Sequence, residues 1–202
     1  GIVPLTDTEW FDDDACHRLE EFISVAWDKG HLEDNLAFLA DNLSPKKTES
    51  SRETLRRYLC DGFFKDHLQT YKKRPIYWLF SSGKQKAFQC LVYLHRYNEG
   101  TLSRMRSEYV IPLQGKMAAR IEKLAGDIQV ATSSAHQKRL EKEREKLGKQ
   151  QVELLAFDEK LRHYADRRIT LDLDDGVKVN YGKFGDLLAE VTAVHGQKPE
   201  GV

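Results

Sequence analysis

Leucine recurs every seven residues in the second half of the chain, at Leu140, Leu147, Leu154 and Leu161. Such a repeat places its members along one face of a helix, where they pack against a second helix. The preceding segment supplies that helix, because apolar residues from Val110 to Ile128 follow one another at intervals of three or four. A short polar turn at residues 131–134 joins the two segments. The pattern therefore predicts a long, antiparallel, coiled-coil-like helical hairpin.

The second arm of this hairpin is expected to span residues 134–166, and a rise of about 1.5 Å per residue makes it roughly 50 Å long. Ser134 followed by Gln137 fits a capping box at its start. Polar residues interrupt the leucine repeat at positions 143–144 and 150–151. We therefore expect loose packing toward the tip of the hairpin.

Further helices are predicted in the first part of the chain. Residues 10–27 carry apolar side chains at helical spacing behind Asp7 and Thr8, which fit an N-cap. A second helix fits residues 31–43, whose leucines share one face. A third apolar stripe occupies residues 51–68 and predicts another helix.

Two apolar, aromatic runs then interrupt the helical pattern. Ile76 to Phe80 is rich in β-branched and aromatic residues, and Pro75 suits the first position of a strand. Residues 81–83 supply turn chemistry, and a second run follows at residues 88–97. We predict two antiparallel strands. The second run also has the propensity for a helix, and a stretch this short has too little periodicity to decide.

These elements predict a mainly α fold with a small antiparallel β element, that is, an α+β chain. We expect a helical domain with a β-hairpin at residues 1–109, the helical hairpin at residues 110–168, and a closing part at residues 169–202 that packs back on the first part. In the closing part, an Asp-Gly turn precedes a short strand at residues 177–180 and a small helix at residues 183–191.

The formal net charge is zero, with 32 basic and 32 acidic residues, but the charges are segregated. Residues 1–45 hold 2 basic and 11 acidic groups, whereas residues 46–109 hold 14 basic and 6 acidic groups. A basic middle beside an acidic end fits two interpretations: a polyanion bound on one face, or pairing of the ends with the middle inside the molecule.

The chain carries no recognisable catalytic motif. Residues 82–84, Ser-Gly-Lys, are similar to the end of a phosphate-binding loop, but Trp78 stands where that motif needs its first glycine. Neither a G-x-S-x-G elbow nor an H-x-x-x-H pair occurs. The five prolines are never adjacent, so the Pro-Pro-aromatic stretch that grips a flipped base is missing. The acidic runs at residues 12–14 and 172–176 fit a helix start and a turn better than a metal site.

The cysteine and hydropathy patterns favour a reducing, cytoplasmic setting without membrane contact. The three cysteines are far apart and lack C-x-x-C spacing, which indicates neither a disulfide framework nor a thiolate metal site. No apolar run approaches the roughly 18 residues needed to cross a bilayer. Because the chain begins at Gly1 without an initiator methionine, we expect a piece of a longer polypeptide, or a tag remnant at Gly1.

Three stretches carry a family resemblance: "GIVPLTDTEWFDDD", the block from Leu55 to Leu124, and "DLDDGVKVNYGKF". They resemble the carboxyl-terminal region of the PglX family, the adenine-specific DNA methyltransferases of bacteriophage-exclusion (BREX) systems, and of related large type II restriction-modification methyltransferases. The resemblance covers nearly the whole chain, and its most specific block runs from Phe63 to Tyr97.

The resemblance implies a parent enzyme that methylates the N6 of adenine with S-adenosylmethionine in a phage-defence system. The family's catalytic motif matches no position here, so no catalytic residue is carried over, and no cofactor is expected in the fragment itself. What is implied is a noncatalytic, monomeric region that binds the DNA backbone or positions the target-recognition region. The alternative is a structural spacer or a docking module for another phage-defence protein, without DNA contact.

Basic residues around the predicted β-hairpin are the candidates for contact with duplex DNA, because phosphate contacts need only suitably placed cations. The candidates are Lys72, Lys73, Arg74, Lys84, Lys86, Arg104 and Arg106. The first five are expected to cluster at one end of the hairpin. For each residue, the alternative is a solvated rim around an aromatic core.

Overall fold

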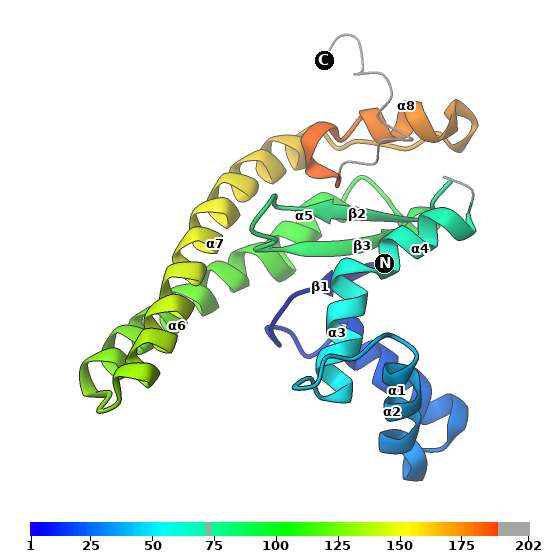
Figure 1. The fold of residues 1–202 in the computed structure, drawn as a ribbon. Helices are drawn as coiled ribbons and strands as arrows, with labels where there is room; N and C mark the ends of the chain where they lie inside the picture. The colour runs from blue at the N-terminus through cyan, green and yellow to red at the C-terminus, as the bar shows by residue number, and fades with distance from the viewer. Residues whose placement is uncertain (72–73, 190–202) are drawn as a thin grey trace. The chain divides into compact units, whose positions relative to one another are not determined.

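The computed structural model describes residues 1–71 and 74–189, and it has the predicted fold class, mainly helical with a small antiparallel sheet (Figure 1). The chain divides into two compact units. Unit 1 comprises Gly1–Leu79 and Gln89–Arg96, and unit 2 comprises Phe80–Phe88 and the chain from Tyr97 onward. The division into three parts at residues 109 and 168 stays a prediction.

Unit 1 contains the helices α1 (Ala15–Trp27), α2 (Leu32–Asp41), α3 (Ser51–Asp61) and α4 (Phe63–Thr70). Ile23, Leu36 and Leu55 bring buried side chains from the first three helices into one core. The predicted helix at residues 31–43 is confirmed with slightly shorter ends. The third predicted stripe forms two helices, because the helix is interrupted at Gly62, which ends α3 and precedes α4.

Helix α1 begins five residues later than predicted, and its N-cap is Asp14. The Asp14 carboxylate accepts a hydrogen bond from the backbone N–H of His17 at 3.0 Å. The Arg56 guanidinium, from α3, pairs with the same carboxylate, whose side chain is only 1% exposed. The predicted cap at Asp7 and Thr8 is therefore wrong, because the carboxylate that caps the helix is the one that α3 holds in place.

The sheet has the strand order β1-β3-β2, with β1 at Ile2–Leu5, β2 at Tyr77–Ser81 and β3 at Gln89–Tyr93. The predicted antiparallel hairpin of β2 and β3 is confirmed. The second run is a strand and not a helix because it lies at the centre of the sheet, with a partner on each side. Strand β1 was not predicted, and it pairs with β3 in the register Ile2↔Val92 to Leu5↔Gln89. Pro4 is tolerated there because β1 is an edge strand.

Unit 2 is built on the predicted helical hairpin. Its helices are α5 (Thr101–Met105), a π-helical turn (Arg106–Val110), α6 (Ile111–Val130) and α7 (Ser134–Asp166), and α6 and α7 lie side by side (Figure 1). The four leucines of the heptad repeat are buried on α7. The predicted capping box is wrong, because the N-cap is Ser133 and its side chain makes no capping hydrogen bond.

The closing part differs from the prediction. The expected strand at residues 177–180 is wrong, because these residues belong to helix α8 (Gly176–Gly182). The buried Asn180 side chain explains the helix, since its amide donates to the carbonyl oxygens of Asp172 and Gly176. The expected helix at residues 183–191 is a single 3-10 turn at Gly185–Leu187, and its last two positions lie outside the described residues.

His67 connects α4 to the start of β2 in unit 1. Its Nε2 atom accepts hydrogen bonds from the backbone N–H groups of Ile76 and Tyr77, each at 3.2 Å. Only a neutral imidazole has an acceptor nitrogen, so the proton of this ring resides on Nδ1. Burial of the ring lowers its pKa below the ordinary value. The neutral form of His67 is therefore the form that the fold requires.

We predict that the free energy of unfolding falls as the pH drops below the ordinary histidine pKa of about 6.5. The unfolded chain binds a proton there that the folded chain resists, so stability contributed by neutral His67 is complete above that pH and is lost below it. His67→Leu should remove this part of the pH dependence and cost roughly 1–3 kcal/mol at neutral pH, because two buried donors lose their acceptor. Urea unfolding at pH 7.5 and pH 5.5 measures both effects.

The matched control is His95→Leu, because His95 is exposed and borders the same sheet. Surface substitutions of this kind usually change stability by less than about 0.5 kcal/mol. If His67→Leu and His95→Leu have equal effects at both pH values, the role given to His67 is wrong.

Candidate nucleic-acid interface

Residues 82–88, the β2–β3 loop, are fastened to α7 by one carboxylate. Glu153 accepts hydrogen bonds from the Ser82 hydroxyl at 2.7 Å and from the backbone N–H groups of Gln85 at 2.7 Å and Ala87 at 3.2 Å. The Ser82 oxygen in turn accepts the Phe88 N–H at 2.9 Å. Hydrogen bonds to an ionised acceptor are about twice as strong as neutral ones, so Glu153 sets the conformation of the loop.

Two more residues adapt the loop to α7. The buried Gln150 side chain donates to the carbonyl oxygen of Gln85 at 3.1 Å. Gly83 has a φ of 139°, and a Cβ atom there would lie 2.8 Å from the Glu153 carboxylate. Glycine is therefore required on both conformational and steric grounds. The polar position 150, expected to loosen the hairpin, instead holds the loop.

Lys84 and Lys86 are the predicted candidates that this loop presents, and both are exposed. Lys86 has a positive φ of 48°, an uncommon conformation outside glycine. Phe88 closes the loop and is fully buried, with its ring near those of Tyr109 and Phe157. The loop therefore has a buried end and an exposed basic tip, held in one conformation.

The two candidate arginines of unit 2 are engaged in ion pairs. Arg106 makes a two-point contact with Asp158 of α7, at 2.7 and 3.1 Å, and the Asp158 side chain is 11% exposed. Arg104 makes a similar contact with Glu108, at 2.9 and 3.0 Å, on the surface. Arg106 thus fastens the π-helical turn to α7, and its cation is committed to the fold.

The remaining predicted candidates belong to different parts of the chain. Arg74 is exposed in unit 1, just before β2, whereas Lys84 and Lys86 are exposed in unit 2, just after it. Lys72 and Lys73 lie outside the described residues. The clustering of these five residues stays a prediction.

The structure adds a row of cations on α7 that was not among the predicted candidates. Arg139, Lys142, Lys146 and Lys149 are exposed and follow one another at intervals of three, four and three residues. This spacing places them on one face of the helix, and we call them the α7 basic stripe. Glu153 comes four residues later on the same face, so the β2–β3 loop joins the stripe at that end. The signal was present in the sequence as helical spacing between the leucines.

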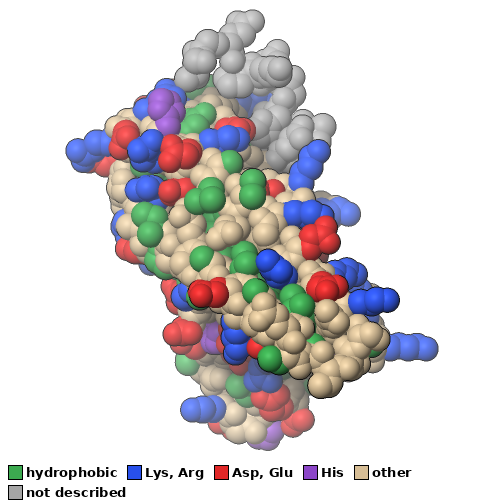
Figure 2. Space-filling view, turned by 90° about the vertical axis from the view of Figure 1, so that its left-hand side faces the viewer, with side chains coloured by type: hydrophobic (Ala, Val, Ile, Leu, Met, Phe, Trp, Pro, Cys, Tyr) green, Lys and Arg blue, Asp and Glu red, His purple; other side chains and the backbone are tan. Residues whose placement is uncertain are grey.

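The ion pair at one end of the stripe leaves Lys149 exposed. Lys149 pairs with Glu145 at 2.6 Å, but both side chains are more than half exposed. Exposed pairs of this kind contribute little and exchange readily for other partners. On the face shown in Figure 2, Lys and Arg side chains are interspersed with Asp and Glu. The stripe is therefore a local feature of α7 and not part of a uniformly positive surface.

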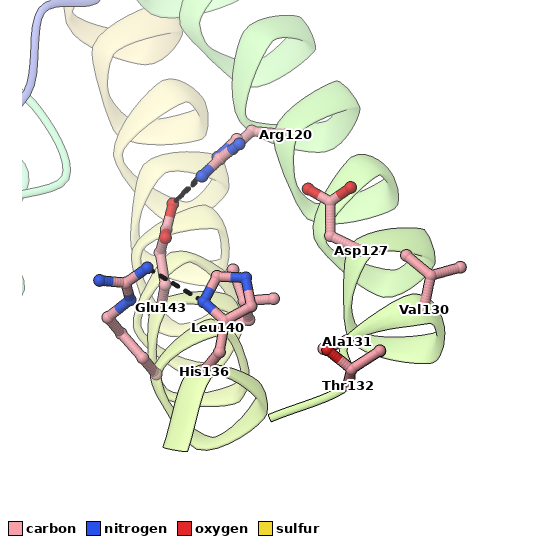
Figure 3. Close-up of a pocket in the computed structure, with 9 residues that line it drawn as sticks. Arg120, Asp127, Val130, Ala131, Thr132, His136, Leu140 and Glu143 are labelled. Atoms are coloured by element: carbon pink, nitrogen blue, oxygen red, sulfur yellow. Dashed lines mark hydrogen bonds and ion pairs between the residues drawn. The ribbon is translucent and has the colours of Figure 1, made fainter. Parts of the chain in front are cut away.

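A hollow of about 490 Å³ lies at the tip of the hairpin, between the end of α6 and the start of α7 (Figure 3). Arg120 from α6 pairs with Glu143 from α7 at 2.6 Å, and Arg139 contacts the His136 ring at 3.0 Å. Asp127 lines the α6 side. The opposite charges balance each other here, and the open hollow agrees with the loose packing expected at the tip.

The tip hollow and the small space beside β1 do not fit S-adenosylmethionine. The tip hollow is lined by helix side chains without a glycine-rich loop, and the space beside β1 encloses only about 130 Å³ in all, too little for a ligand of that size. Burial raises the pKa of Cys16 to about 11 and that of Cys60 to about 12, so these thiols stay protonated near neutral pH. Neither of these two hollows therefore suits the cofactor, and neither Cys16 nor Cys60 is an activated thiol.

Metal and membrane sites have no support in the same residues. Over residues 1–71 and 74–189, histidine, cysteine and carboxylate side chains form no group of three or more that suits a metal ion. Every helix in this described part is too short or too polar to span a bilayer.

We predict that Glu153→Ala releases the β2–β3 loop without unfolding α7. The substitution removes three hydrogen bonds to a charged acceptor, each contributing roughly 1.5–3 kcal/mol. Hydrogen–deuterium exchange of peptides covering residues 82–88 should become faster, while exchange along α7 stays unchanged. Glu159→Ala is the control, because Glu159 is exposed on α7 and pairs with Arg162. Unchanged exchange of the loop in Glu153→Ala would contradict the assignment.

Comparison with known proteins gives the chain a family context. No protein-family model matches it. An adenine-specific methyltransferase BrxX of Escherichia coli O9:H4 (strain HS) is 57% identical over 207 aligned residues, which cover 100% of this chain and 17% of that protein. An adenine-specific methyltransferase PglX of Lacticaseibacillus casei (strain Zhang) is 41% identical over 185 residues, which cover 90% of this chain and 15% of that protein. The chain is thus homologous to a region of the BrxX and PglX adenine-specific methyltransferases and spans about one sixth of their length.

Proposed function

We propose that this chain is a noncatalytic region of an adenine-specific DNA methyltransferase, and that its β2–β3 loop and α7 basic stripe bind the DNA backbone. The single observation that carries the proposal is the position of Glu153. Its hydrogen bonds hold the loop at the end of the stripe, so that Lys84 and Lys86 extend a row of cations that begins at Arg139. The two relatives are adenine-specific methyltransferases, and from this we infer that the ligand is DNA.

The geometry suits a backbone contact and not base readout. From Arg139 to Lys149 the stripe spans ten residues, or about 15 Å of helix. Ammonium and guanidinium groups at such spacing neutralise phosphates and release condensed counterions, and they read no sequence. The rigid loop adds cations without the ordering entropy that a flexible segment would lose. The region would then help to hold the duplex or to position the target-recognition region.

Methyl transfer itself is assigned to the rest of the longer protein. S-adenosylmethionine supplies the methyl group in such enzymes, and neither the tip hollow nor the space beside β1 fits it. The Pro-Pro-aromatic stretch that grips a flipped base is also missing from the sequence. The residues of this chain therefore act on the substrate by binding and orientation alone.

The alternative is a docking module that makes no DNA contact. It is favoured by the ion pairs of unit 1, where Arg52 binds Glu20 and Glu33 and Arg56 binds Asp14. These pairs engage two of the 14 basic residues in the middle of the sequence. The two functions differ in one measurable respect, which is whether the exposed lysines contribute to DNA affinity.

We predict that Lys142→Ala, Lys146→Ala and Lys149→Ala, combined in the full-length methyltransferase, weaken binding to a labelled duplex equally for different DNA sequences. The slope of log K against log salt should become shallower by about 0.9 for each phosphate that the variant no longer neutralises. Lys84→Ala with Lys86→Ala should act in the same direction. Fluorescence anisotropy between about 50 and 200 mM salt measures both quantities.

Arg144→Ala provides the matched control. Arg144 is exposed and lies two residues from both Lys142 and Lys146, which places it on the opposite side of α7. It should leave the salt slope unchanged. If the triple lysine variant also leaves the slope unchanged, or if Arg144→Ala reduces it equally, backbone binding by the stripe is wrong and the docking function gains support.

A further inference from the structure

The α1–α2 helix pair of unit 1 exposes a concentration of large apolar side chains. Phe22 is 62% exposed, Val25 is 88% exposed and Trp27 is 55% exposed on α1, and Phe38 is 69% exposed on α2. Single exposed apolar residues are ordinary, but four within 17 residues of sequence are a different case. Contiguous apolar exposure on a folded domain marks an interaction surface, and the rings of Phe22 and Trp27 are in contact.

The core of unit 1 does not need these side chains. Val25 lies two residues from Ile23, and Phe38 lies two residues from both Leu36 and Ala40, all three of which are buried. Two residues turn an α-helix by about 200°, so Val25 and Phe38 face away from the core. An ordinary surface helix is polar on that face. The sequence has placed apolar residues on both faces of these helices.

The two aromatic residues of α1 are also preorganised by contact with each other. The rings of Phe22 and Trp27 meet edge to face, with centroids 6.3 Å apart. Such a pair presents a rigid apolar surface at low cost in conformational entropy, and aromatic anchors of this kind dominate the binding energy of protein interfaces.

The charges around these residues select the occupant. Residues 15–43 contain two basic and six acidic residues. Glu21, Asp34 and Asp41 are exposed on the two helices. A carboxylate rim repels DNA phosphates and attracts lysine and arginine. The occupant is therefore a protein surface with an apolar centre and a basic rim.

We propose that another region of the same methyltransferase polypeptide covers the outer faces of α1 and α2. The relatives carry the homologous segment within a chain about six times as long, of which the segment is 17% in one case and 15% in the other. The proposal rests on that part of the proposed function which makes the chain a region of such an enzyme. It does not depend on the α7 basic stripe or on any DNA contact.

The test is cysteine labelling in the full-length methyltransferase, with a maleimide as the probe and peptide mass spectrometry to quantify each site. Val25→Cys and Asp12→Cys are compared, because both positions are exposed in this chain and Asp12 precedes α1. The cysteine at position 25 should react roughly tenfold more slowly than that at position 12, and both should react equally in urea. Equal rates in the native protein overturn the proposal.

Charge reversal tests the chemistry of the occupant. Asp34→Lys with Asp41→Lys, added to Val25→Cys, should raise the labelling rate of position 25 toward that of position 12. The basic rim of the occupant would then face lysines in place of carboxylates and be repelled. An unchanged labelling rate would contradict the inference that the occupant has a basic rim. Protection of position 25 that develops only on adding duplex DNA, or only on adding a second protein, overturns the assignment to the same polypeptide. The function of the stripe is tested by the salt dependence of DNA binding, whereas this proposal is tested by the labelling rate of position 25. The two proposals can therefore fail independently.

Discussion

The carboxylate of Glu153 is the interaction on which the arrangement of unit 2 depends. It accepts three hydrogen bonds from a loop that is 66 to 71 residues away in sequence. The loop also makes two hydrogen bonds within its own backbone, from the Ser82 N–H to Phe88 and from the Lys86 N–H to Gly83, and the carboxylate adds its three to these. Because Glu153 of α7 binds the loop, the helix and the loop form one surface. The requirement for glycine at position 83 follows from the same contact.

Arginine and lysine have different roles in this chain, and the difference is physical. Arg52, Arg56 and Arg106 make ion pairs with carboxylates across the fold. A planar guanidinium matches a carboxylate at two points and tolerates partial burial, whereas an ammonium is strongly hydrated and stays at the surface. Lys84 and Lys142 are exposed accordingly. Of the predicted candidates, Arg104 and Arg106 are committed to ion pairs, although sequence alone ranks all cations alike.

The helical hairpin was predictable because a heptad repeat depends only on local spacing. The arm predicted at residues 134–166 agrees with α7 at both ends. The hairpin strands were predictable for a similar reason, since β-branched and aromatic runs around a turn are a local signal. Two of the failures involve distant partners. Strand β1 exists because β3 pairs with it, and the N-cap of α1 is Asp14 because Arg56, far along the chain, holds it there.

The same limit explains the candidate site. Lys84 and Lys86 were named as candidates because they flank a recognisable turn, but the hydrogen bonds from their loop to Glu153 depend on a contact that no spacing reveals. The α7 basic stripe was visible as a pattern, yet charges between heptad leucines are common in solvated helices and acquire meaning only beside the loop. The net charge of the chain hides its charged surfaces, because a sum of zero combines an acidic α1–α2 surface with exposed lysines on α7. A net charge of zero therefore does not describe the charge of any single element, and a ligand responds mainly to the charges of the element it contacts, since screening at physiological salt weakens fields beyond about 8 Å.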